Sequence, residues 1–198
     1  MSPLIETIRL FDGEFNNLPY HAARLKRAWE NLFHIPPPFD LKELVSSYPI
    51  PSQGLFKCRI TYDTEVRDIE ILHYQVKPVT SLKLVYDDTI SYHHKFKDRS
   101  ALDLLFAQRG PCDDVLIIRN GLVTDTSYAN IVFKKNDAWF TPATYLLQGT
   151  MRQSLIDRKM VEEREITVDE IPLFDSFKLI NSMLMWELPE LATSCVVR

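Results

Sequence analysis

Two neighbouring lysines are the residues of this chain best suited to nucleophilic chemistry. The segment SYHHKFKDRSALD, residues 91–103, places Lys95 and Lys97 beside His93 and His94. A lysine becomes a nucleophile or a base only when the pKa of its ammonium group falls, and burial and nearby cations both lower it. In an extended segment the two lysines share one face, so the pattern alone does not choose between them. A solvated basic turn is the alternative interpretation.

The composition indicates a globular protein whose partners are small molecules or other subunits. With 198 residues, the chain can form one domain or two small ones. Its 23 basic and 27 acidic residues give a net charge of −4, so no overall field favours nucleic acid or an anionic membrane. The N-terminus lacks the pattern of a signal peptide, and no apolar run approaches the ~20 residues that cross a bilayer. We therefore expect a cytoplasmic protein.

The three cysteines indicate neither a zinc site nor a disulfide framework. Cys58, Cys112 and Cys195 are an odd, widely spaced set without a CxxC motif. Free thiols of this kind are typical of a reducing compartment. We predict no metal site.

The first half of the chain predicts a small α+β domain over residues 1–79. The expected elements, in chain order, are a strand with a turn, a long helix, a short helix and a β-hairpin: residues 4–15, 19–33, 39–48 and 55–76. Leu25, Ala28, Trp29 and Leu32 recur at helical spacing. The prolines of IPPPFD should end the long helix, because proline removes a backbone donor.

The second half, residues 82–198, predicts a barrel-like β domain with packed helices. An alternating strand at 82–88 precedes a helix at 98–108, for which Asp98 or Ser100 is the expected cap. Residues 113–142 indicate consecutive hairpins, and Asn120-Gly121 is the strongest turn signal because both central residues of a type I′ turn need positive φ. A further helix should open at Gly149, and residues 177–186 should form a last buried strand. The fold class is therefore mixed α+β.

Four segments, in the right order, resemble the signature segments of the class IV aminotransferases, the fold-type IV pyridoxal-phosphate enzymes. They are YHAARL, KFKDR, VTDTSYANIVF and LLQGTMRQ, at residues 20–25, 95–99, 123–133 and 146–153. In that family the lysine that forms a Schiff base with the cofactor lies four residues before an arginine, as Lys95 lies before Arg99. The resemblance implies that Lys95, not Lys97, is the catalytic residue. It also implies a homodimer with pyridoxal 5′-phosphate as cofactor.

The resemblance further implies which residues hold that cofactor. Arg24 matches the arginine of the family's His-x-x-Arg-Leu motif and would pair with the phosphate through its planar guanidinium. A glycine turn entering a helix would present backbone N–H groups to the same phosphate, and a polar pair near the last strand would complete its contacts. These residues are Gly149, Thr150 and Met151, then Asn181 and Ser182. Asp125 stands where the family usually has a glutamate that accepts a hydrogen bond from the pyridinium nitrogen.

Two short segments favour one reaction of the family. GTMRQ is similar to the Gly-Ile-Met-Arg-Gln of aminodeoxychorismate lyases, and NSMLM, which ends at Met185, is similar to their Asn-Ala-Leu-Met. The resemblance thus favours a lyase that releases 4-aminobenzoate and pyruvate. A D- or branched-chain amino-acid transaminase and a catalytically weak homologue that binds pyridoxal phosphate remain as alternatives. Arg9, Arg59 and Arg67 are the candidates to bind a substrate carboxylate.

Overall fold

The computed structural model of the chain describes residues 2–184 and 186–198. Met185, the end of the NSMLM segment, lies outside the described residues. The contacts divide the chain into two compact units. Unit 1 comprises Met1–Val76 and His94–Asp98, and unit 2 comprises Lys77–His93 and Arg99–Arg198.

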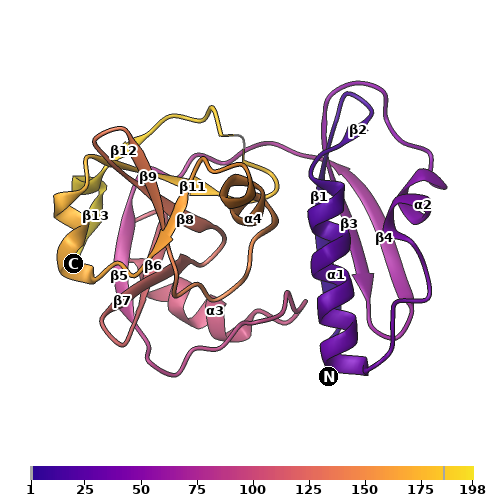
Figure 1. Cartoon of the computed structure of the whole chain (residues 1–198), viewed down its shortest axis with the longest axis horizontal. Coiled ribbons are helices and arrows are strands. Elements are labelled where there is room, and N and C mark those ends of the chain that lie inside the picture. Colours follow the sequence, from indigo (N-terminus) through magenta and orange to yellow (C-terminus); the bar gives the residue numbers. More distant parts are fainter. Residues whose placement is uncertain (1, 185) are drawn as a thin grey trace. The chain divides into compact units, whose positions relative to one another are not determined.

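Unit 1 is one antiparallel sheet with a helix along one face (Figure 1). The strand order is β2-β1-β3-β4. The strands are β1 (Leu4–Phe11), β2 (Glu14–Phe15), β3 (Leu55–Tyr62) and β4 (Val66–His73), and the helices are α1 (Leu18–Phe33) and α2 (Leu41–Ser46). The expected strand, helices and hairpin are confirmed.

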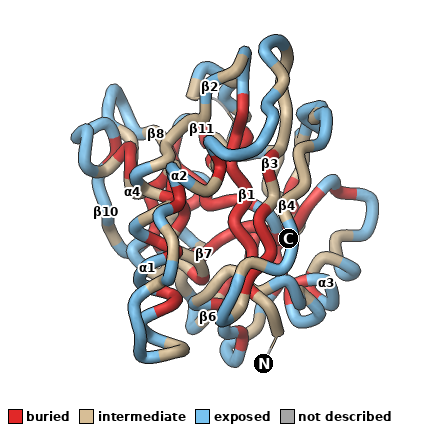
Figure 2. The backbone as a smooth tube through the Cα atoms, turned by 90° about the vertical axis from the view of Figure 1, so that its right-hand side faces the viewer, coloured by how far each residue is buried: buried red, intermediate tan, exposed pale blue. Residues whose placement is uncertain are grey.

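The apolar stripe of α1 forms the core of unit 1 with the sheet. Leu25, Ala28 and Trp29 are buried, as their spacing predicts, and the ring of Trp29 stacks on Tyr62 of β3 at 5.6 Å between centroids. All of β1 except Phe11 is buried, which Figure 2 shows as a red tube. The helix ends at Phe33, just before the prolines that cannot continue it.

The segment that carries Lys95 is bound to the edge of β1. The backbone N–H of Ile5 donates to the carbonyl of Lys95 at 2.9 Å, and the N–H of Lys97 donates to the carbonyl of Pro3 at 2.7 Å. Phe96 forms an isolated bridge with Leu4. The sequence places this segment in the second domain, residues 82–198, whereas its contacts group His94–Asp98 with unit 1.

Unit 2 consists of two sheets that enclose one core, as expected for a barrel-like β domain. The sheets have the orders β10-β9-β8-β11-β12 and β13-β5-β6-β7. The strands are β5 (Leu82–Tyr86), β6 (Asp114–Arg119), β7 (Leu122–Thr126), β8 (Asn130–Lys135), β9 (Ala138–Pro142), β10 (Glu162–Arg164), β11 (Ser176–Ile180), β12 (Leu191–Ala192) and β13 (Val196–Val197); the α-helices are α3 (Ser100–Phe106) and α4 (Thr150–Asp157). Buried Leu116 and Ile118 of β6 meet Phe133 of β8 and Phe177 of β11 in that core.

Two details of unit 2 differ from the sequence prediction. The N-cap of α3 is Arg99, not Asp98 or Ser100, because the helix begins one residue later than a cap at Asp98 requires. The strand at the end of the chain, β11, ends at Ile180, and the short strands β12 and β13 follow it. The Asn120-Gly121 turn between β6 and β7 is confirmed, with φ of 52° and 76°.

No helix among the described residues is long and apolar enough to cross a membrane. The cytoplasmic location stays a prediction.

Candidate functional site

A buried ionic cluster lies beside the Lys95 segment in unit 1. Glu6 of β1 is fully buried, and its two carboxylate oxygens accept hydrogen bonds from Arg24 Nε at 2.9 Å and Arg24 Nη2 at 2.6 Å. The Nδ1 of His21 lies 2.6 Å from the same carboxylate. Arg24 therefore holds an internal anion in a bidentate pair, and β1 and α1 are joined by charge as well as by apolar packing.

The pKa values of the cluster follow from burial and from the opposite charges. Burial alone would raise the pKa of Glu6, but the charge of Arg24 and hydrogen bonds from His21 and Arg24 lower it to about 2. Burial lowers the pKa of His21 against the opposing effect of Glu6, and the charge of Lys95 lowers it further. The ionised Glu6 carboxylate can only accept hydrogen bonds, so the Nδ1–H of His21 donates to it.

Sequence reasoning identified Arg24 but missed Glu6 and His21. A signal for Glu6 existed: it occupies the same strand face as Leu4 and Ile8, both of which are buried under α1. An acid on an apolar face needs a cationic partner. Which cation pairs with it could not be read from the spacing.

Replacing Arg24 with methionine should destabilise the protein strongly, because it leaves the Glu6 carboxylate buried without its cation. Breaking one side of a buried pair costs about 3–5 kcal/mol. The matched control is Lys26→Met on the same helix, where the exposed ion pair with Glu30, 3.8 Å long, should contribute less than ~1 kcal/mol. Urea unfolding monitored by tryptophan fluorescence gives both values, and equal losses would contradict the assignment.

The Glu6–Arg24 pair should make the stability of the fold fall as the pH is lowered. The pKa of Glu6 is about 2 in the folded state, against an ordinary value of 4.5 for this side chain, so ionised Glu6 stabilises the fold above pH 4.5. That contribution should be lost as the pH falls from 4.5 toward 2. Arg24→Met should remove most of this acid sensitivity.

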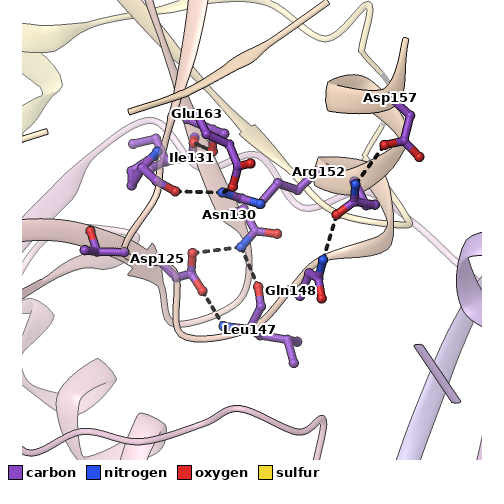
Figure 3. Close-up of polar contacts among 12 residues, drawn as sticks. Asp125, Asn130, Ile131, Leu147, Gln148, Arg152, Asp157 and Glu163 are labelled. Carbon is purple, nitrogen blue, oxygen red and sulfur yellow. Dashed lines mark hydrogen bonds and ion pairs between the residues drawn. The ribbon is translucent and has the colours of Figure 1, made fainter. Parts of the chain in front are cut away.

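A second buried carboxylate lies in unit 2. Asp125, near the end of β7, accepts a hydrogen bond from Asn130 Nδ2 on Oδ1 at 2.8 Å. Its Oδ2 accepts from the backbone N–H groups of Leu146 and Leu147, both at 2.9 Å (Figure 3). Burial raises the pKa of Asp125 to about 6, against the effect of these hydrogen bonds and of the Arg152 charge.

The predicted glycine turn begins α4. Gly149 is the N-cap, and Thr150 and Met151 are the first two residues of the eight-residue helix. A Cβ atom at Gly149 would lie 1.9 Å from Asn130 Oδ1, so only glycine fits. The structure thus places Asp125, Asn130 and the start of α4 around one short loop.

The polar pair at Asn181 and Ser182 directly follows β11. Asn181 Oδ1 accepts from the backbone N–H groups of Met183 and Leu184 at 2.8 and 3.0 Å, so this side chain closes the turn after the strand. Its Nδ2 donates to the carbonyl of Tyr128 at 3.5 Å. Ser182 is half-buried.

Two of the three candidate substrate arginines, of which Arg9 is buried, lie on one face of the unit 1 sheet. Arg9 of β1 pairs in register with Lys57 of β3, and Thr7 pairs with Arg59, so alternation puts all three cations on the sheet face opposite Glu6. Burial and the Arg59 charge lower the pKa of Lys57, which sequence reasoning missed.

Arg67 is not part of that group of cations. It is half-exposed near the β3–β4 turn, where its guanidinium pairs with Asp63 at 2.9 Å and also with Glu65. The structure therefore brings together Arg9, Lys57 and Arg59 and leaves Arg67 with acidic partners of its own.

The chain matches the model of the amino-transferase class IV family over residues 59–187. An uncharacterized protein from Haemophilus influenzae is 39% identical over 186 residues, which cover 92% of this chain and 98% of that protein. A candidate aminodeoxychorismate lyase from Schizosaccharomyces pombe is 26% identical over 219 residues, which cover 96% of this chain and 93% of that protein. The crystal structure of a candidate 4-amino-4-deoxychorismate lyase from Haemophilus somnus has a TM-score of 0.87 and 34% identity, covering 92% of this chain and 97% of the other.

Proposed function

Because the chain belongs to the amino-transferase class IV family, we propose that it is a pyridoxal-phosphate enzyme that cleaves 4-amino-4-deoxychorismate to 4-aminobenzoate and pyruvate. The observation that carries the proposal is the similarity, over nearly the whole of both chains, to a candidate lyase of that substrate. The GTMRQ segment, whose helix begins as that resemblance requires, supports the same reaction.

The residues around α4 fit the phosphate and the ring nitrogen of the cofactor. The first N–H groups of a helix find no acceptor within the helix, and they suit an anion. Gly149, Thr150 and Met151 form that first turn, and Asn181 and Ser182 would add side-chain contacts.

Asp125 also fits its proposed role. A carboxylate oxygen can accept two hydrogen bonds, and Oδ1 accepts one from Asn130, so it can accept another from a pyridinium N–H. Protonation of the ring nitrogen would in turn favour the ionised form of Asp125.

When bound, pyridoxal phosphate supplies an aldehyde that condenses with amines and a ring that withdraws electrons from the substrate. Lys95 would hold the cofactor covalently until the substrate amine displaces it, and its freed amine would then carry a proton to and from the substrate carbon. Arg24 would contribute positive charge toward the phosphate while it keeps its pair with Glu6.

The cationic face of the unit 1 sheet supports a substrate with carboxylate groups. Arg9 and Arg59 keep their proposed role, and Lys57 joins them because it lies in register with Arg9. Arg67 is left out because Asp63 and Glu65 hold its guanidinium. Arg59→Ala should therefore raise KM more than it lowers kcat.

We also propose that the enzyme is a homodimer, as the family resemblance implies. Units of this size bury a small fraction of their surface, so a partner subunit would add stability. Light scattering of the cofactor-loaded protein checks this. A monomer that keeps its cofactor would contradict it.

The requirement for an acceptor tests the reaction. With 4-amino-4-deoxychorismate as the only substrate, the protein should release pyruvate and 4-aminobenzoate in equal amounts over many turnovers. A transaminase cannot do so, because it needs an oxo acid to remove the amino group in each cycle. Pyruvate is measured with a coupled dehydrogenase and 4-aminobenzoate by its fluorescence.

Two outcomes would reject the lyase. Strict dependence on 2-oxoglutarate or pyruvate would assign a D- or branched-chain amino-acid transaminase. Absence of turnover with every amine, with cofactor bound, would assign a catalytically weak binding homologue. Lys95→Ala is the negative control in both assays.

A further inference from the structure

Both backbone polar groups of Leu147 are held by side chains. Its N–H donates to Asp125 Oδ2 at 2.9 Å, and its carbonyl accepts from Asn130 Nδ2 at 2.9 Å. Figure 3 shows the two side chains beside this one residue. Because the adjacent N–H of Leu146 also donates to Asp125, the loop before α4 is fixed at three backbone groups.

Asn130 occupies the centre of this arrangement. An amide nitrogen carries two hydrogens, and Asn130 directs one to Asp125 Oδ1 at 2.8 Å and the other to Leu147. Its side-chain oxygen lies against Gly149, so close that a Cβ atom at Gly149 would be 1.9 Å from this oxygen. Asn130 is buried, and it thus contacts the loop at Leu147, three residues before α4 begins, and at Gly149, the N-cap of α4.

We propose that Asn130 is a positioning residue for the cofactor phosphate. It fixes the Leu147–Gly149 segment, and through that segment it fixes the direction of the N–H groups in the first turn of α4. The inference rests on the proposed function, in which this turn binds the phosphate. Asn130 acts through the backbone and has no role in the covalent step at Lys95.

The role requires an amide and a facing glycine together. Asn130→Ala removes both hydrogens that hold Asp125 and Leu147, so the turn should loosen. Gly149→Ala should move the turn, because its methyl group would collide with the Asn130 oxygen. The double variant removes that collision, so the two substitutions should not be additive.

The experiment measures the affinity of the protein for pyridoxine 5′-phosphate and for pyridoxine by calorimetry. Neither probe can condense with Lys95, so the ratio of their affinities reports phosphate binding alone. Asn130→Ala should weaken binding of the phosphate form about tenfold, which is the change in affinity expected from losing about one hydrogen bond. The affinity for pyridoxine should stay within about twofold. Gln148→Ala is the matched control, because Gln148 lies in the same loop but its side-chain amide donates to Gln153 Oε1 of α4 and not to a loop backbone group.

The outcomes separate this inference from the function on which it rests. If the unchanged protein binds both probes equally, the proposed phosphate site is wrong. If it prefers the phosphate form and Asn130→Ala keeps the full preference, or loses both probes equally, the positioning role is wrong. Should Asn130→Ala fail to fold, the double variant Asn130→Ala/Gly149→Ala is compared with Gly149→Ala alone. A double variant that binds the phosphate form less tightly than Gly149→Ala, or that also fails to fold, contradicts the proposal.

Discussion

Lys95→Ala should abolish the covalent attachment of pyridoxal phosphate to the protein, whereas Lys97→Ala should leave it intact. Borohydride reduction of the loaded protein fixes the cofactor on its lysine, and peptide mass spectrometry then locates it. We expect the label on the peptide of Lys95 in the unchanged protein and in Lys97→Ala, and no label in Lys95→Ala. Label on Lys97 would overturn the assignment.

The structure gives a physical reason to choose between the two lysines. Lys97 is exposed, so water solvates its ammonium group. Lys95 is half-buried, and its charge acts on buried His21. Burial removes part of the water that stabilises an ammonium group, and only the neutral amine is a nucleophile.

Asp125→Asn should lower kcat/KM about 10²–10³-fold at saturating cofactor, the typical cost of losing one well-placed charge in an active site. Asparagine has nearly the size of aspartate but no charge to keep a ring nitrogen protonated. It also turns one end of the side chain into a donor, which would face either the backbone N–H groups of Leu146 and Leu147 or the Asn130 amide.

Two further variants show whether the charge of Asp125 causes the loss of activity. Asp125→Glu keeps the charge and should retain more activity than Asp125→Asn. Asp113→Asn is the control, because Asp113 accepts hydrogen bonds from Thr80 and Ser81 in an exposed turn and should not affect the rate. Normal turnover of Asp125→Asn with bound cofactor would make Asp125 a structural residue of the loop.

Local patterns predicted the elements of the fold because the physics that forms them is local. The apolar spacing on α1 and the Asn120-Gly121 turn each depend on residues within a few positions of one another. The cap of α3 was wrong because helix ends depend on how the preceding segment runs. That segment is held by hydrogen bonds to Pro3 and Ile5, far away in the sequence.

The site could be predicted in part, where a family resemblance supplied what spacing could not. Glu6 and His21 were missed because their partnership needs β1 and α1 to pack together, 15 residues apart. The neighbours of Asp125 were missed for another reason. Two of its donors are backbone N–H groups, which every residue except proline carries and which therefore leave no mark in the sequence.

The central claim is that this chain uses bound pyridoxal phosphate to react with an amine substrate, and the absorption spectrum of the loaded protein tests it most directly. The protein should show a visible cofactor band, and adding 4-amino-4-deoxychorismate should shift that band within the time of a turnover. Before substrate is added, Lys95→Ala should not show the band at the wavelength of the unchanged protein. A band that never moves, with this substrate or with D- or L-amino acids, would contradict the account and leave a protein that binds the cofactor without using it.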